Sequence, residues 1–172
     1  MPRRQPLTLE IVLTIRPTKM LARQLGIDVP TDLPVVPSRV ADWCAHSFSV
    51  GRRRWLIFCN TASFYPVFAH ARGVNDGDAL VRRLGGMVAH VLRETGQADR
   101  AGLFEKELGA VQWASIPGRS VLGSMNDLVY LAGACLDDPD LTPAVLSHKV
   151  GQAPMSALGM NRPAEAFASL KT

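Results

Sequence analysis

The chain has 172 residues, enough for one domain with its own core, and its 47% hydrophobic and 20% charged residues are typical of a globular protein. No apolar run approaches the roughly 18 to 20 residues of a membrane span, and the opening MPRRQPLTLE lacks the apolar segment of a signal peptide. A cytoplasmic protein with no membrane partner is therefore expected. The three cysteines, without the spacing of a disulfide framework, suit a reducing compartment.

The first predicted element is a strand. Residues 9–16, LEIVLTIR, alternate between two faces as a half-buried strand does, and Pro17 ends the run. Thr18 can cap a short helix over residues 19–25, which Gly26 ends. The proline-containing residues 28–38 then predict an extended loop.

Three strands joined by short turns are predicted next, at residues 43–50, 54–60 and 64–69. Gly51 marks the first turn, and Pro66 favours an edge strand or a bulge in the third strand.

Two helices follow these strands. Asp76 or Asp78 caps the first, whose apolar residues recur at helical spacing over residues 81–92. The second helix covers residues 98–108 and is more charged.

A strand at residues 111–116 and a helix that begins at Ser120 complete the pattern, which ends at the turn 137–140. The order β-α-βββ-αα-β-α predicts a single α+β domain over residues 1–140, with helices on one face of a mainly antiparallel sheet. Residues 141–172 are rich in Ala, Pro, Ser and Gly and predict a C-terminal tail that is partly ordered at most, with one short helix at residues 163–170.

The stretch GRSVLGSMND, residues 118–127, carries the first candidate site. A helix start exposes unpaired N–H groups that favour an anion, and a guanidinium beside it adds a bidentate donor for phosphate or carboxylate. Ser120, Ser124 and Asp127 share one helical stripe. The candidate ligand-binding residues are Arg119, Ser120, Ser124, Asn126 and Asp127, with Lys19 as electrostatic support.

A structural alternative exists for the same stretch. Ser120 would be the N-cap, Gly123 would let a strand pack close, and Asn126 and Asp127 would satisfy buried backbone groups in the core. The two interpretations differ in one expected result: if the stretch is a site, Arg119→Ala abolishes binding and leaves the fold intact.

The run R-S-V-L-G-S-M-N-D at residues 119–127 resembles the hallmark of an uncharacterised bacterial family of plasmid and chromosomal open reading frames. Weaker similarities support the resemblance over roughly residues 9–136. They are Thr18-Lys19, Trp43, Asn60 at a strand end, and Pro66-Val67. The resemblance implies a shared fold and no particular activity.

Positive charge is concentrated in the first part of the chain. Residues 1–100 hold 14 Lys and Arg against 8 Asp and Glu, a net charge of +6, whereas residues 101–172 hold 5 against 7, a net charge of −2. Arg52, Arg53 and Arg54 are adjacent and are the second candidate site, for nucleic acid, because phosphates attract clustered arginines. Trp43 and Trp55 would add rings for base stacking. The alternative is a solvated hairpin turn.

Cys44, His46 and Cys59 form a weak alternative metal site for zinc. With a two-residue hairpin loop they share one face of the sheet: a loop at residues 51–52 sets Cys44 opposite Cys59, and a loop at 52–53 sets His46 there. An ordinary core that contains small cysteines explains them as well. We expect neither metal nor cofactor.

The leading functional hypothesis is binding of a phosphate-bearing ligand, nucleic acid or nucleotide, at the helix start near residues 119–127. One alternative is a small metal-dependent nuclease or phosphoryl-transfer hydrolase, with Asp127 as metal ligand or base. Another is a protein–protein interaction module whose C-terminal tail docks on a partner. The sequence leaves the oligomeric state open.

Overall fold

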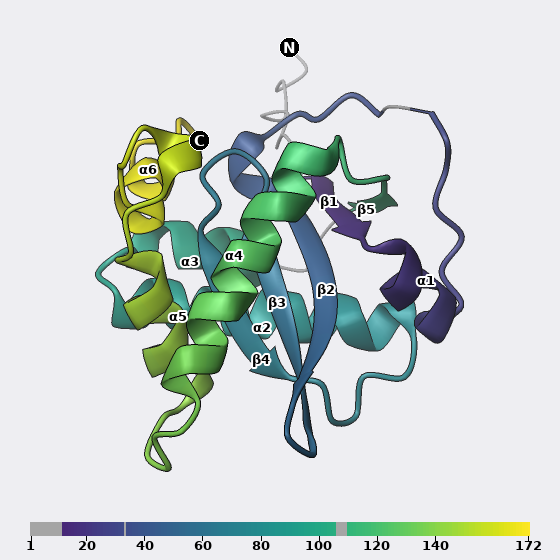
Figure 1. Ribbon diagram of the computed structural model, residues 1–172. Coiled ribbons are helices and arrows are strands. Elements are labelled where there is room, and N and C mark those ends of the chain that lie inside the picture. The colour runs from purple at the N-terminus through teal and green to yellow at the C-terminus, as the bar shows by residue number, and fades with distance from the viewer. Residues whose placement is uncertain (1–11, 33, 106–109) are drawn as a thin grey trace.

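A five-stranded mixed sheet forms the centre of the molecule in the computed structural model, which describes residues 12–32, 34–105 and 110–172 (Figure 1). The strand order is β4-β3-β2-β1-β5, and β1 is parallel to both of its neighbours, whereas β2, β3 and β4 form an antiparallel meander. The strands are β1 (Val12–Pro17), β2 (Asp42–Val50), β3 (Arg53–Asn60), β4 (Pro66–His70) and β5 (Ala110–Trp113).

Helices cover both faces of this sheet (Figure 1). The α-helices are α1 (Lys19–Leu25), α2 (Gly77–Glu94), α3 (Ala98–Glu105), α4 (Arg119–Cys135), α5 (Pro143–Gly151) and α6 (Pro163–Ala168). Two short 3-10 helices, η1 (Arg39–Ala41) and η2 (Ser156–Leu158), complete the described elements. The α+β class is therefore confirmed.

The expectation that helices pack on one face was wrong. The meander strands are apolar on both sides: Leu56 and Phe58 belong to the core cluster that contains α2, and Ile57 belongs to the cluster that contains α4 and α5. A sheet that is apolar on both faces buries both faces, so each needs its own layer of helices.

Most local signals in the sequence produce the elements expected from them. The Thr18 side chain accepts a hydrogen bond from the backbone N–H of Leu21, and Gly26 closes α1 in the left-handed conformation at φ 66°. Asp76, rather than Asp78, caps α2. Pro66 begins β4, the edge strand that its position favoured.

Some boundaries differ from the expected ones. Helix α4 begins at Arg119 with Gly118 as its N-cap, one residue before Ser120. Strand β5 ends at Trp113, before the expected end at residue 116. Residues 9–11 of the first predicted strand and 106–108 of the second predicted helix after β4 lie outside the described residues.

The segment 141–172, expected to be a partly ordered tail, forms α5, η2 and α6 instead. Leu146 and Val150 pack in the cluster on the α4 side of the sheet, and Phe167 is fully buried in the cluster on the other side. The start of α5 is encoded locally, since Thr142 caps it and Pro143 follows at its first position. The predicted short helix near residue 163 is confirmed as α6.

None of the described helices is both long and apolar enough to cross a lipid bilayer.

Candidate anion-binding site

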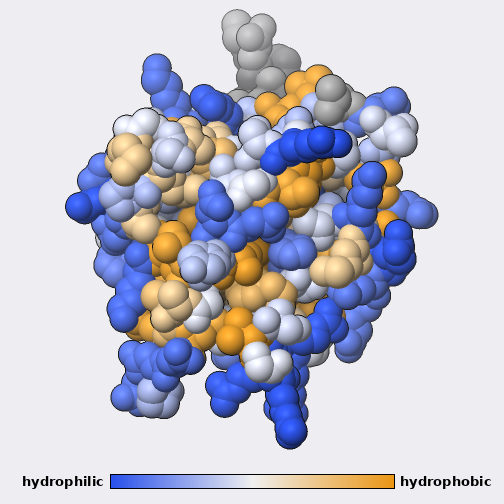
Figure 2. Space-filling model, viewed as in Figure 1, coloured by the Kyte–Doolittle hydropathy of each residue, from blue (hydrophilic) through white to orange (hydrophobic). Residues whose placement is uncertain are grey.

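The β2–β3 hairpin exposes three consecutive arginines at one end of the sheet. Val50 pairs with Arg53, so Gly51 and Arg52 form a two-residue loop, and Gly51 takes the positive φ of 59° that this tight turn requires. Arg52, Arg53 and Arg54 are all exposed. Strongly hydrophilic side chains gather at this end of the molecule in Figure 2.

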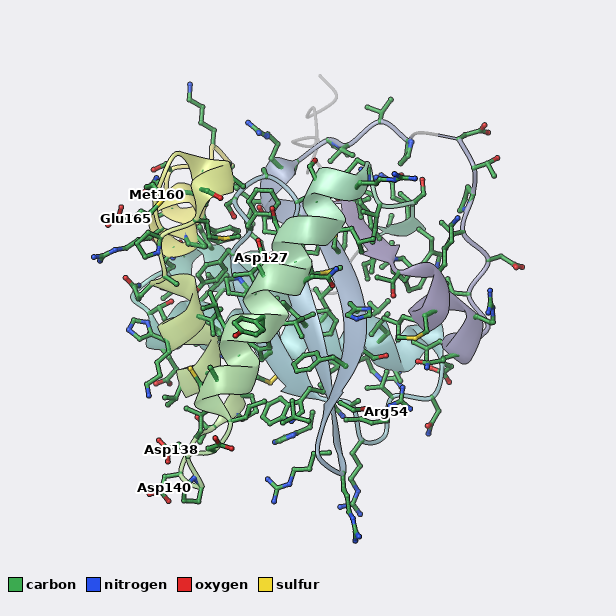
Figure 3. All side chains as sticks on the ribbon, in the orientation of Figure 1. Arg54, Asp127, Asp138, Asp140, Met160 and Glu165 are labelled. Carbon is green, nitrogen blue, oxygen red and sulfur yellow. The ribbon has the colours of Figure 1, made fainter. Side chains whose placement is uncertain are left out.

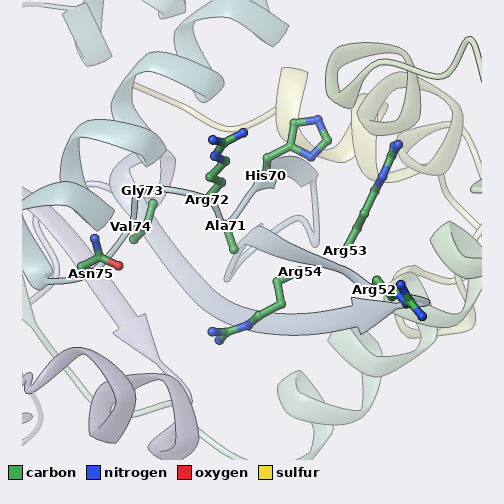
Figure 4. Close-up of a pocket in the computed structure, with 9 residues that line it drawn as sticks. All are labelled: Arg52, Arg53, Arg54, His70, Ala71, Arg72, Gly73, Val74 and Asn75. Atoms are coloured by element: carbon green, nitrogen blue, oxygen red, sulfur yellow. The ribbon is translucent and has the colours of Figure 1, made fainter.

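A hollow of about 660 Å³ lies beside the hairpin, and we call it the arginine hollow. Figure 4 shows its lining, which comes from the hairpin and from the segment that follows β4. The lining residues are Arg52, Arg53, Arg54, His70, Ala71, Arg72, Gly73, Val74 and Asn75. A smaller hollow of about 280 Å³ adjoins it at Gly73 and is lined by Arg82 and Arg83 of α2.

Strand register explains why these segments meet. Trp55 on β3 pairs with His70 on β4, and the N–H of Ala71 donates to the carbonyl of Arg54 at 3.1 Å. The segment after β4 is therefore fixed against the start of β3. Sequence reasoning found the three hairpin arginines and missed Arg72, Arg82 and Arg83, because nothing in their local pattern indicates that β4 pairs in this register.

Two of these arginines are held by hydrogen bonds that shape the site. Arg83 donates from Nη1 to the carbonyl of His70 and from Nη2 to the carbonyl of Arg72 at 2.9 Å, which ties α2 to the loop. Arg54 donates to Oε1 of Gln24 at 2.9 Å.

No ion pair among the described residues neutralises these cations. Within the described residues the side-chain ion pairs are Arg16–Asp42 and Arg93–Glu105, and neither belongs to the arginine hollow. Acidic residues flank the hollow on two sides: Asp76 and Asp78 follow its lining segment at the start of α2, and Asp138 lines a separate hollow of about 380 Å³ together with Arg52 and Arg53. The arginine hollow is thus a concentrated positive surface.

His70 is the single ring among the residues that line the arginine hollow. Its centroid lies 4.4 Å from the ring of Trp55, which is 3% exposed, so His70 covers the tryptophan. Partial burial, with the positive charges of Arg53 and Arg83, lowers the pKa of His70. The imidazole is therefore neutral at pH 7.

Neither tryptophan offers the expected base-stacking surface. Trp55 lies beneath His70, and Trp43 is fully buried on the opposite face of the sheet, where its indole N–H donates to the carbonyl of Val40 at 2.8 Å. Recognition of a ligand at the hairpin end therefore depends on charge and hydrogen bonding.

The residues predicted at the start of α4 lie elsewhere (Figure 1). Arg119 and Ser120 are exposed on its first turn, Ser124 is buried, and Asn126 and Asp127 are exposed further along. Figure 3 shows Asp127 on α4 and Arg54 beside the hairpin as separate places on the molecule.

Neither interpretation of the α4 start matches its geometry in full. No side chain caps the helix, so Ser120 is not its N-cap. A Cβ added at Gly123 would meet no atom of the described residues within 4 Å, so none of these residues requires a glycine here. Lys19 is exposed at the first position of α1, and no hydrogen bond or ion pair among the described residues joins it to α4.

The Cys44, His46 and Cys59 set adopts the first of the two predicted registers, in which Cys44 faces Cys59 and His46 faces Ile57. Nδ1 of His46 lies 3.1 Å from Oγ1 of Thr18, which already caps α1. Burial raises the pKa of Cys44 to about 11 and that of Cys59 well above its usual value, which opposes the thiolate form that zinc needs. In the described parts of the chain, no group of three His, Cys, Asp or Glu side chains is placed to hold a metal.

The cysteines yield a direct prediction. We expect one thiol per native molecule to react rapidly with a chromogenic disulfide reagent at pH 8, because Cys135 is partly exposed whereas Cys44 and Cys59 are fully buried. All three should react in guanidinium chloride, and Cys135→Ser should abolish the native reaction. Rapid reaction of two or three thiols in the native protein would contradict the burial of Cys44 and Cys59.

A buried ion pair joins β1 to β2. Arg16 and Asp42 are 5% and 7% exposed, and Nε of Arg16 lies 2.8 Å from Oδ1 of Asp42. A second nitrogen of the same guanidinium lies 3.3 Å from Oδ2, and a third donates to the carbonyl of Ser115 at 2.6 Å. Arg16 thus ties β1 to β2 and to the connection between β5 and α4. The alternation of residues 9–16 puts Arg16 on the face opposite Leu13 and Ile15, and no local pattern indicates its pairing with Asp42.

Comparison with known proteins identifies one family. A family model described as a domain of unknown function (DUF6933) matches residues 14–166, from β1 into α6. No curated protein matches the chain.

Proposed function

Because the chain belongs to this family, whose description assigns no activity, we propose a function from geometry: the arginine hollow binds a phosphate-bearing ligand. One observation carries the proposal. Arg52, Arg53, Arg54 and Arg72 line one hollow, with no carboxylate among its lining residues.

The energetics of clustered guanidinium groups support an anionic ligand. Arginine stays charged at any physiological pH, so the cluster cannot relieve its repulsion by losing protons. An anion relieves it instead, and the planar guanidinium fork matches two oxygens of a phosphate. The start of α4 offers a single guanidinium, at Arg119, and the same helix carries an exposed carboxylate about two turns further along, at Asp127. The hollow is therefore the better phosphate site.

The two alternative functions gain no support from the described residues. The hydrolase alternative relies on Asp127, which is exposed on α4 and belongs to no group of three side chains that could hold a metal. The interaction alternative relies on a tail that docks on a partner, but the main apolar residues of α5 and α6 are buried within this chain.

Fluorescence anisotropy with a labelled DNA duplex of about 20 base pairs at low salt tests the proposal. The triple variant R52Q/R53Q/R72Q should weaken binding by about 100-fold, since each charge-assisted hydrogen bond to phosphate contributes ~1 kcal/mol or more. The matched control R39Q/R162Q/K171Q removes the same charge from exposed positions outside the hollow, and it should bind nearly as the unmodified protein does.

Arg119→Ala separates the two candidate sites. The variant should retain the affinity of the unmodified protein, because Arg119 does not line the arginine hollow. If Arg119→Ala abolishes binding while R52Q/R53Q/R72Q does not, the anion binds at the start of α4. If the two triple variants weaken binding equally, overall charge rather than the hollow accounts for the affinity.

A further inference from the structure

We infer that the ligand of the arginine hollow is the backbone of a nucleic-acid duplex, contacted at several successive phosphates, and not a single nucleotide. The inference rests on the proposed function and specifies its ligand. It follows from the extent of the positive surface, from the rings available at the site and from the shape of the hairpin.

The positive surface extends beyond what one nucleotide can contact. It starts at the hairpin, passes Arg72 in the loop after β4, and continues across Gly73 into the adjoining hollow at Arg82 and Arg83. A duplex carries one negative charge per ~1.7 Å of its axis, so it can engage such a row along its whole length. The phosphates of one nucleotide would leave much of the row without a counter-charge.

Carboxylates lie on two sides of the positive surface, and Asp76 and Asp78 at the start of α2 directly follow the loop that lines the arginine hollow. Asp138 lies on the opposite side, in the hollow that it shares with Arg52 and Arg53. A phosphate backbone is repelled from that side. The arginines themselves form a path from the hairpin tip past Arg72 to Arg82, which lies one turn after Asp78 on α2.

The site lacks a surface on which an unpaired base could stack. His70 is the single ring in the lining, and its centroid is already 4.4 Å from that of Trp55. Proteins that bind single strands or nucleotides commonly stack the bases on exposed aromatic rings. A duplex keeps its bases stacked inside and presents phosphates outside, which matches a site made of arginines.

The hairpin itself suits a duplex. It projects from the end of the sheet in Figure 1, with Arg52 in its loop and Arg53 directly after it. The major groove of DNA admits a two-stranded ribbon of this kind, while Arg72 and Arg82 remain on the body of the protein to meet the backbone.

Anisotropy competition among three probes tests the inference: a DNA duplex of about 20 base pairs, one of its strands alone, and ATP. The duplex should bind at least about 10-fold more tightly than the single strand, and ATP should compete only at millimolar concentration. The duplex affinity should also fall steeply with salt, as it does for proteins that neutralise several phosphates.

Arg82→Gln supplies the discriminating variant, because Arg82 is exposed and lines only the adjoining hollow. It should reduce the slope of log affinity against log salt by about 1 for the duplex, the amount expected for one lost phosphate contact. Arg39→Gln, an exposed arginine that lines neither hollow, is the control and should leave the slope unchanged.

The outcomes distinguish a failure of the duplex inference from a failure of the proposed phosphate binding. If ATP or the single strand binds as tightly as the duplex, or if Arg82→Gln leaves the duplex slope unchanged, the duplex inference is overturned and phosphate binding stands. If none of the three probes binds at low salt, the proposed function itself fails.

Discussion

Asp42→Ala is expected to lower the free energy of unfolding by about 3 to 5 kcal/mol, as the breaking of buried ion pairs does in other proteins. The substitution leaves the guanidinium of Arg16 buried, with the carbonyl of Ser115 as its remaining partner. A buried cation that loses its counter-ion costs far more than an exposed one, because no water replaces the carboxylate. Chemical denaturation followed by circular dichroism measures the change.

A double variant provides the control for this prediction. Arg16→Met with Asp42→Ala removes both charges, so it should recover much of the stability that Asp42→Ala loses. A loss below about 1 kcal/mol for Asp42→Ala would show that the pair behaves as an exposed salt bridge does, and that Arg16 reaches solvent.

Phe167→Ala is expected to destabilise the fold by about 3 to 5 kcal/mol, the range for large-to-small changes at buried aromatic residues. The ring is fully buried and contacts Trp43 at 5.7 Å and Tyr65 at 4.9 Å between centroids. Arg100 also lies over the ring, 5.3 Å from its centroid, and donates to the Phe167 carbonyl at 2.7 Å. Thermal and denaturant unfolding measure the effect, and tryptophan fluorescence, to which Trp43 contributes with Trp55 and Trp113, reports the change in packing.

Tyr130→Ala is the matched control, since this aromatic residue of α4 is 81% exposed. Its replacement should change stability by less than about 0.5 kcal/mol. Equal effects of the two substitutions would mean that the segment 141–172 does not pack on the sheet.

Local signals in the sequence predicted most elements because they depend on neighbours along the chain. Thr18 and Gly26 bound α1, and residues 51–52, one of the two loops that the sequence left open, set Cys44 opposite Cys59. Each of these features depends on a helix cap, on a residue with positive φ, or on apolar and polar residues that alternate with a period of two. All three signals are visible within a few residues of sequence.

Local signals could not predict which distant strands pair with one another. The parallel contacts of β1 with β2 and β5 join segments far apart in the chain, and they bury Arg16. The packing of α5 and α6 was missed for a related reason. Both helices are short, so their stability comes from tertiary contacts such as those of Phe167 rather than from a long periodic pattern.

The candidate site was partly visible in the sequence. Three adjacent arginines, at residues 52–54, stand out in any composition analysis, but Arg72 and Arg82 look like ordinary surface residues until the β3–β4 register brings their segments to the hairpin. At the start of α4 the motif was conspicuous in the sequence. The sequence did not show which of its side chains face the core. In the structure Ser124 is buried, whereas Asn126 and Asp127 are exposed.

A nuclear magnetic resonance titration locates the anion on the protein most directly. The sample is isotopically labelled, the ligand is the unlabelled duplex, and the signals are the arginine Nε–Hε groups and the ring of His70. Phosphate binding in the arginine hollow predicts shifts at Arg52, Arg53, Arg72 and His70, with Arg119 unchanged. Shifts at Arg119 with an unperturbed hairpin, or no shifts at any arginine, would contradict phosphate binding in the hollow.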